Sequence, residues 1–288
     1  MPIVRTNDID TYYERRGDGP VLLFVHAAIV DASQWLPQLE ALSDEYTTIA
    51  YDVRGHGLTG RSEREEYSVD LFVDDLEALV EELELDQPVI VGLSTGGCIA
   101  QAYAVRHPES IAGLVLADTF TAAVLDWRDR VQFAALRATV PPARLVGYER
   151  VERVKNWFHE RFDAGATGDY GNIERLRRGK PNMATDEFAK VIRAIADFPE
   201  TTVDLTAITV PTLVLYGENE LQFIRRHVLR IAAEIPDVTV RKVPNAGHAA
   251  NLDNHEFFTA AMAAFLTDHI YTDRTPSVGE PGDTGEPV

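Results

Sequence analysis

Short apolar runs alternate with longer amphipathic segments along most of the chain. Strands are predicted at the apolar runs 3–6, 10–16, 21–25, 47–51, 89–91, 111–117, 210–217 and 238–243. Helices are predicted where apolar residues recur at helical spacing or follow a capping residue, at 33–42, 69–84, 97–106, 223–235 and 254–267. Strands that alternate with helices favour an α/β fold with a mostly parallel central sheet and helices on both of its faces.

Residues 119–205 break this alternation. Helices are predicted there, and no strand, at 126–139, 143–160, 172–178 and 185–197, with Pro141-Pro142, 165–171 and Pro199 between them. The pattern indicates an all-helical insertion after the sixth strand. The chain therefore divides into an α/β core (1–118 and 206–272), a helical cap (119–205) and a tail (273–288) that is expected to be disordered because its apolar content is low.

One short motif stands at the junction of a predicted strand and a predicted helix. Gly92-Leu-Ser94-Thr-Gly96 follows the apolar run 89–91, and small residues compatible with a helix follow it. This is the G-x-S-x-G pattern in the strand–turn–helix context that lifts a serine hydroxyl clear of the sheet edge. Ser94 is therefore the candidate nucleophile.

Length and composition limit the class of protein. A chain of 288 residues can bury one substantial core, and it contains no apolar run near the ~18 residues that span a bilayer. The N-terminal residues lack the pattern of a signal peptide, and the single cysteine, Cys98, excludes an intrachain disulfide. We therefore expect a cytoplasmic protein without membrane association.

The net charge of −19 comes from 46 acidic and 27 basic residues. Such a charge disfavours nucleic acid and anionic membrane surfaces as partners. Only four of the basic residues are lysines, and an acidic, lysine-poor composition is typical of proteins from halophiles, in which salt screens the self-repulsion. A GC-rich genome would also favour arginine over lysine, so both explanations stay open.

Five stretches in a fixed order resemble the α/β-hydrolase family. They are Phe24-Val-His-Ala-Ala28, Asp52-Val-Arg-Gly-His-Gly57, Gly92-Leu-Ser-Thr-Gly-Gly97, Leu213-Val-Leu-Tyr-Gly-Glu-Asn-Glu220 and Asn245-Ala-Gly-His248. The resemblance covers residues 3–270 and implies the α/β-hydrolase fold. It is greatest to the group of esterases, 3-oxoadipate enol-lactonases and non-haem haloperoxidases that carry a helical cap after the sixth strand.

The resemblance also implies a catalytic triad in the chain order serine, acid, histidine. A serine hydroxyl needs a base, and the base needs an orienting acid. His248, in the loop after the last strand, matches the family's base. Glu220 stands where the family most often has aspartate, and Asp118, after the sixth strand, is the alternative acid.

An oxyanion hole requires two main-chain N–H groups directed at the developing negative charge. The resemblance assigns these groups to Thr95, directly after the nucleophile, and to Ala28, in the loop after His26. The family usually has glycine where this chain has Ala27. Alanine fits that position only if its φ angle is negative, because a positive φ would be costly.

A serine at the nucleophile position favours an acyl-enzyme route over dehalogenase or epoxide-hydrolase chemistry. We therefore expect a serine hydrolase that acts on a small ester or lactone and needs no cofactor. Perhydrolysis, carbon–carbon hydrolysis and acyl transfer would use the same triad, and a ligand-binding receptor with a weakened triad is an alternative from another class. The histidine spacing fits no metal site, and the oligomeric state stays open. The aromatic residues expected near the substrate are Trp35, Phe120, Trp127 and Trp157, although packing in a core is an alternative for most of them.

Overall fold

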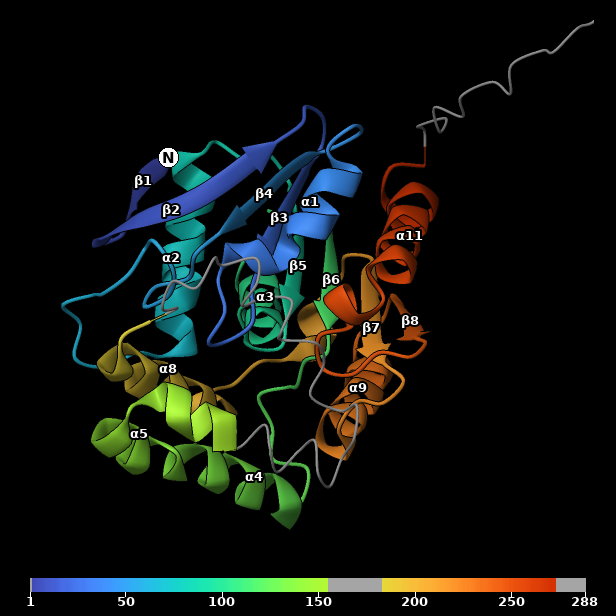
Figure 1. The fold of residues 1–288 in the computed structure, drawn as a ribbon. Helices are drawn as coiled ribbons and strands as arrows, with labels where there is room; N and C mark the ends of the chain where they lie inside the picture. The colour runs from blue at the N-terminus through green and yellow to red at the C-terminus, as the bar shows by residue number, and fades with distance from the viewer. Residues whose placement is uncertain (1, 155–182, 273–288) are drawn as a thin grey trace, which may run out of the picture.

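The central sheet consists of eight strands in the order β1-β2-β4-β3-β5-β6-β7-β8. The computed structural model describes residues 2–154 and 183–272. Its strands are β1 (Ile3–Thr6), β2 (Ile9–Arg16), β3 (Val21–Val25), β4 (Thr47–Tyr51), β5 (Val89–Leu93), β6 (Gly113–Ala117), β7 (Thr212–Gly217) and β8 (Val238–Val243). β2 pairs antiparallel with β1 and β4, and the pairs from β4 to β8 are parallel (Figure 1). The predicted α/β architecture with a mostly parallel central sheet is confirmed.

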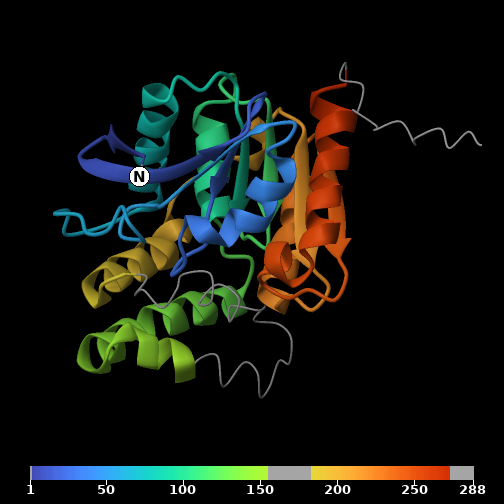
Figure 2. The same cartoon turned by 45° about the horizontal axis from the view of Figure 1, so that its top comes forward.

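Alternate residues of the central strands enter two separate cores, because successive side chains of a strand point to opposite faces. Leu23 and Val25 join the core formed with α2 (Val69–Glu82), α3 (Thr95–Arg106) and α9 (Gln222–Glu234). Leu22 and Phe24 join the core formed with α1 (Leu36–Leu42) and α11 (His255–Phe265). Figure 2 shows these helices covering the two faces of the sheet. The central strands β3, β5 and β6 have no polar side chain because both faces of the sheet are covered there.

Two predicted helices differ from the structure at their starts. The first begins as a 3-10 turn (Ala32–Trp35) whose N-cap is Asp31 and not Ser33, because the Asp31 carboxylate accepts the Ser33 N–H. The last predicted helix is preceded by the short α10 (Ala250–Asp253), and Asn254 caps α11. Further short elements are the 3-10 turns Phe198–Glu200 and Leu205–Ala207 and the π turn Leu266–Ile270.

The described part of the segment between β6 and β7 contains helices and loops and no strand. It contains α4 (Trp127–Ala138), α5 (Val140–Val146) and α8 (Thr185–Asp197), which lie together below the sheet in Figure 1. The predicted helix over 143–160 is wrong at its start: α5 begins at Val140 with both prolines in its first turn, where a missing N–H has no cost. The same prediction is also wrong at Gly147, which at φ 89 ends α5 before helical residues resume at 148–154. The rest of that predicted helix and the predicted helix over 172–178 lie outside the described residues.

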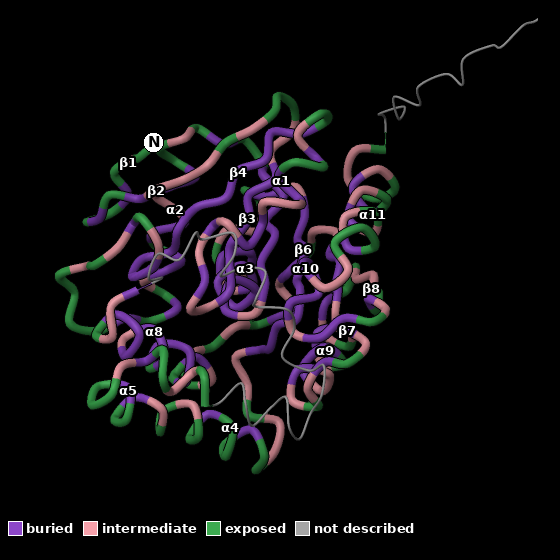
Figure 3. Tube along the Cα trace, viewed as in Figure 1, coloured by how far each residue is buried: buried purple, intermediate pink, exposed green. Residues whose placement is uncertain are grey.

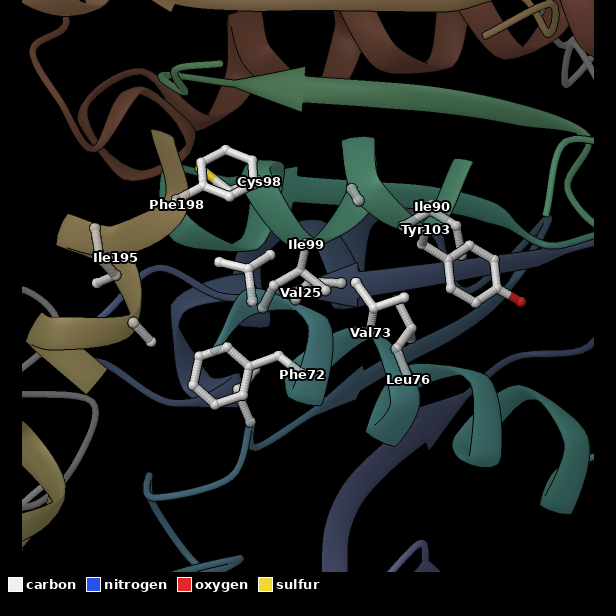
Figure 4. Close-up of a cluster of buried hydrophobic side chains, with 14 of the residues drawn as sticks. Val25, Phe72, Val73, Leu76, Ile90, Cys98, Ile99, Tyr103, Ile195 and Phe198 are labelled. Carbon is white, nitrogen blue, oxygen red and sulfur yellow. The ribbon is translucent and has the colours of Figure 1, made fainter. Parts of the chain in front are cut away.

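The helical segment shares its apolar core with the sheet. Phe198, which follows α8, lies beside Cys98 of α3 in Figure 4, and Phe72 of α2 belongs to the same cluster. Figure 3 shows the central strands and α3 buried, whereas exposed residues alternate with buried ones along α4 and α5. The turn that follows α8 therefore packs against α3, and α8 itself packs against α4 and α5.

Candidate active site

Ser94 occupies a sharp turn between β5 and α3. Its backbone has φ 54 and ψ −114, a region that non-glycine residues rarely adopt and that is frequent at functional sites. The Ser94 N–H donates to the Ala117 carbonyl at 2.9 Å, so the neighbouring strand β6 holds the turn in place. Ser94 is partly exposed, whereas Leu93 before it and Thr95 after it are buried.

Two glycines allow the turn to be this tight. A Cβ at Gly92 would lie 2.3 Å from the Gly96 carbonyl oxygen, and a Cβ at Gly96 would lie 2.1 Å from the Val25 carbonyl oxygen. Both distances are far below van der Waals contact, and the opposing atoms belong to the main chain. The glycines therefore place the start of α3 directly against the end of β3.

A chain of hydrogen bonds joins three of the predicted site residues. His248 Nε2 lies 3.0 Å from Ser94 Oγ, and His248 Nδ1 lies 2.8 Å from Glu220 Oε2. A carboxylate only accepts hydrogen bonds, so Nδ1 carries the proton and Nε2 accepts the Ser94 hydroxyl. The loops after β5, β7 and β8 supply these residues, and pairing of the parallel strands brings the loops to one edge of the sheet.

The Glu220 carboxylate is fully buried and held at both oxygens. Oε2 accepts from His248, and Oε1 accepts the Leu221 N–H at 2.6 Å. The neighbouring carboxylate of Glu218 is exposed and pairs with Lys242 at 2.9 Å. Only Glu220 of the two thus contacts the imidazole.

Asp118, the alternative acid, makes different contacts. Its Oδ1 accepts the Gly217 N–H at 2.9 Å, and its Oδ2 accepts the Ala250 N–H at 3.1 Å. Burial, and to a smaller extent the charge of Glu220, raises the pKa of Asp118 well above its usual range. In the structure, Glu220 therefore makes the direct hydrogen bond to His248. Asp118 instead accepts hydrogen bonds from the main chain of Gly217 and Ala250.

The loop after β3 faces the start of α3. His26 anchors it, because His26 Nε2 accepts the Val53 N–H at 2.9 Å and Nδ1 donates to the Ala27 carbonyl at 2.7 Å. Ala27 does not have a positive φ, and its N–H donates to Gln34 Oε1. The positive φ in this loop belongs to Ile29, at 64°. Alanine at position 27 is therefore accommodated, and the unusual backbone lies two residues later.

The two N–H groups assigned to the oxyanion hole have no acceptor among the hydrogen bonds of the described residues. Thr95 is the first residue of α3, so its N–H has no partner within the helix. Ala28 is partly exposed in the loop after β3. Neither group is therefore committed to another acceptor in the described part of the chain.

His56 supports the same loop from the turn after β4. Its Nε2 accepts the Ile29 N–H at 3.3 Å, and its Nδ1 donates to the carbonyls of Val53 and Arg54. Burial, and then the adjacent His26, lowers the pKa of His56 to about 3. A protonated Nε2 would also oppose the Ile29 N–H, so the neutral ring is the form that fits this structure.

This arrangement predicts a pH-dependent stability difference between wild type and His56→Gln. Unfolding takes up a proton at His56 between the folded pKa of about 3 and the unfolded value near 6.5, so wild type loses stability as the pH falls below 6.5. Glutamine does not titrate, so the variant does not share this loss. Its free energy of unfolding should therefore rise relative to that of wild type by about 1 kcal/mol per pH unit below 6.5, even if the variant is less stable near neutral pH. Urea unfolding between about pH 5 and 7.5 measures this, and a pH-independent difference would contradict it.

Three of the four predicted aromatic residues lie in the described part of the chain, and their contacts are with core or surface residues. Trp35 is fully buried against Phe24 and Phe258, so it is a core residue and not a substrate contact. Trp127 is 67% exposed on α4, where the Arg128 guanidinium lies over its ring at 5.8 Å. Phe120 is buried in a cluster of aromatic rings with Phe133, Phe198, Phe223 and His227, and Trp157 lies outside the described residues.

Three residues near the site were not predicted from the sequence. Thr119 Oγ1 donates to the Ser94 carbonyl, Gln34 accepts the Ala27 N–H, and Asp253 accepts the Gly247 N–H. All three act on the main chain of a loop that carries a site residue. Such contacts depend on the three-dimensional arrangement and leave no short sequence motif.

Comparison with known proteins agrees with this geometry at the level of the family. Residues 20–255 match the family model described as the alpha/beta hydrolase fold. The chain therefore belongs to the α/β-hydrolase family and is a hydrolase. Residues 2–154 and 183–272 contain no helix that is long and apolar enough to cross a membrane.

Relatives with names for ester or lactone chemistry align over most of the chain. The 3-oxoadipate enol-lactonase 2 of Acinetobacter baylyi is 24% identical, over 87% of this chain and 90% of its own. A thermophilic esterase of Thermogutta terrifontis is 26% identical with a TM-score of 0.73, over 90% of this chain and 93% of its own. The enol-lactonase of Burkholderia xenovorans is 22% identical and supports the fold, with a TM-score of 0.77 over 93% of this chain and 100% of its own.

Proposed function

We propose that the protein is a serine hydrolase that cleaves a carboxylic ester or lactone through an acyl-enzyme intermediate. The observation that carries the proposal is the continuous chain from Ser94 Oγ through His248 to the Glu220 carboxylate. In this proposal Ser94 is the nucleophile, His248 is the general base and then the general acid, and Glu220 orients the imidazole. The esterase and lactonase names among the relatives support the same reaction class.

The proposed reaction begins when Ser94 Oγ attacks the acyl carbonyl and its proton moves to His248 Nε2. The buried Glu220 carboxylate stabilises the imidazolium that forms, and it holds the ring in the productive tautomer. Collapse of the tetrahedral intermediate releases the alkoxide, which takes the proton from Nε2. With an ester the alcohol leaves, and with a lactone the resulting hydroxyl stays on the acyl chain. Water activated by His248 then attacks the acyl-enzyme, which releases the acid and regenerates Ser94 for either substrate.

The N–H groups of Thr95 and Ala28 are the proposed oxyanion donors. The Thr95 N–H lies at the positive end of α3, where the helix dipole favours negative charge. The Gly96 contact with the end of β3 brings the two segments together. We further propose that residues 119–205 form a cap over the pocket and that the substrate is a small, largely apolar ester or lactone.

Reaction with a fluorophosphonate probe tests the proposal, because the probe modifies a serine that a neighbouring histidine activates. We expect stoichiometric labelling, located on Ser94 by peptide mass analysis, and turnover of at least one member of an ester and lactone panel. Measuring the panel at low salt and in molar KCl also tests the proposed adaptation to salt, which full activity at low salt would contradict. A folded protein that neither labels nor hydrolyses any ester would reject the serine mechanism and favour a ligand-binding role.

A further inference from the structure

The end of β6 contacts the turn that carries Ser94 on two sides. The Ala117 carbonyl accepts the Ser94 N–H at 2.9 Å, and Thr119 Oγ1 donates to the Ser94 carbonyl at 2.7 Å. These two bonds fix the peptide groups on either side of the Ser94 Cα atom. The strained φ of 54 at Ser94 is therefore held from outside the turn.

The residue between them, Asp118, bridges the two other loops of the site. Its carboxylate accepts the N–H of Gly217, the last residue of β7, and the N–H of Ala250, the first residue of α10. Gly217 begins the turn that leads to Glu220, which is closed by a bond from the Glu220 N–H to the Gly217 carbonyl at 3.1 Å. Ala250 lies two residues after His248, so one carboxylate holds both loops.

Burial makes these contacts rigid. Asp118 and Thr119 are both 0% exposed, so water does not compete for their hydrogen bonds. Asp118 has φ 42, a conformation that aspartate tolerates better than most residues. The strand end thus presents one carbonyl, one carboxylate and one hydroxyl from three successive residues to the three loops of the site.

We propose that the segment Ala117–Thr119 is the positioning element of the triad, and that Asp118 sets the placement of Glu220 and His248 by holding Gly217 and Ala250. The inference rests on the proposed function, because it gives Ser94, His248 and Glu220 their catalytic roles. Asp118 acts through the main chain and touches neither substrate nor proton. Its replacement should therefore misplace His248 relative to Ser94 without removing any reacting group.

A double-mutant cycle between Asp118→Asn and Glu220→Gln tests this role. Asparagine keeps the size of the side chain but places an NH₂ group against one of the two N–H donors. We expect Asp118→Asn to lower kcat by roughly 10²-fold, as a misplacement of about 1 Å does, with KM nearly unchanged. In the Glu220→Gln background the same change should have almost no further effect on kcat. The reason is that Asp118 aligns the hydrogen bond between His248 and residue 220, and glutamine has already removed the charge of that acceptor.

The control is Asp75→Asn, which alters another buried carboxylate, whose hydrogen bonds go to Arg54 and Asn7 and to none of the three loops of the site. This variant should lower the thermal midpoint without lowering kcat when activity is measured well below the midpoint. Equal kcat losses in both variants would show a general effect of instability and overturn the proposal. An unchanged kcat in Asp118→Asn, or losses that multiply with Glu220→Gln, would also overturn it.

Thr119→Val provides a second route if Asp118→Asn does not fold. It removes the hydroxyl bond to the Ser94 carbonyl at nearly constant volume and should lower kcat by about 10-fold, with KM nearly unchanged. An unchanged kcat would then reject the positioning role. Fluorophosphonate labelling of wild type separates the two proposals. If wild type is labelled and active but the variants keep its kcat, only the positioning role is rejected. If wild type is neither labelled nor active, the serine mechanism itself is rejected.

Discussion

Ser94→Ala is expected to lower kcat for ester hydrolysis by roughly 10⁶-fold and to abolish fluorophosphonate labelling. The reason is that the hydroxyl oxygen forms the acyl-enzyme bond, and no other group near His248 Nε2 replaces it in the proposed mechanism. Folding should be nearly unaffected, because alanine and serine have similar costs at φ 54. Steady-state kinetics on the best ester of the panel, with circular dichroism for the fold, measures both effects.

Ser110→Ala is the matched control, since Ser110 is an exposed serine in the loop after α3. It should retain wild-type labelling and turnover. If Ser94→Ala keeps substantial labelling or turnover, a different nucleophile operates and the assignment of Ser94 is wrong.

Glu220→Gln is expected to lower kcat by roughly 10⁴-fold, the loss seen when an orienting carboxylate becomes an amide. Glutamine can still accept from His248 Nδ1, but it has no charge to stabilise the imidazolium. In wild type the second carboxylate oxygen of Glu220 accepts the Leu221 N–H. In the variant the amide NH₂ group must face either this N–H or His248 Nδ1, and both of these are donors. Labelling should slow in parallel with turnover, because both reactions need the activated serine.

Glu218→Gln is the control for this variant, because Glu218 lies two residues earlier and pairs with Lys242 at the surface. Exposed ion pairs contribute little, so kcat should change by less than about threefold. A loss of roughly 10⁴-fold in Asp118→Asn together with a small loss in Glu220→Gln would make Asp118 the triad acid.

Much of the fold follows from local patterns in the sequence. The strands Val21–Val25 and Thr47–Tyr51 have the predicted limits because apolar runs of this length bury both faces in a parallel sheet. The turn at Ser94 is identifiable for a different reason: glycines at 92 and 96 are required by main-chain contacts, so the motif carries geometric information.

The remaining features depend on contacts that are distant in the sequence. The choice between Glu220 and Asp118 was open because both follow strand ends on the same edge of the sheet. It depends on which side chain reaches His248, and an aspartate held by Gly217 and Ala250 cannot be recognised from its neighbours in the chain. The prediction of Trp35 as a substrate contact is wrong for a similar reason, since part of its burial comes from Phe258 of α11, more than 200 residues later.

The packing of α8 has a consequence for how the helical segment can move. Phe188, Ile192 and Ile195 are buried in the apolar core, and α8 packs against α4 and α5, with Phe188 stacked on Tyr148. Separating α8 from these helices and exposing the three side chains would cost about 6 kcal/mol, so the separated form would be present in only about one molecule in 10⁴. Any displacement of this segment therefore carries α4, α5 and α8 together as one unit.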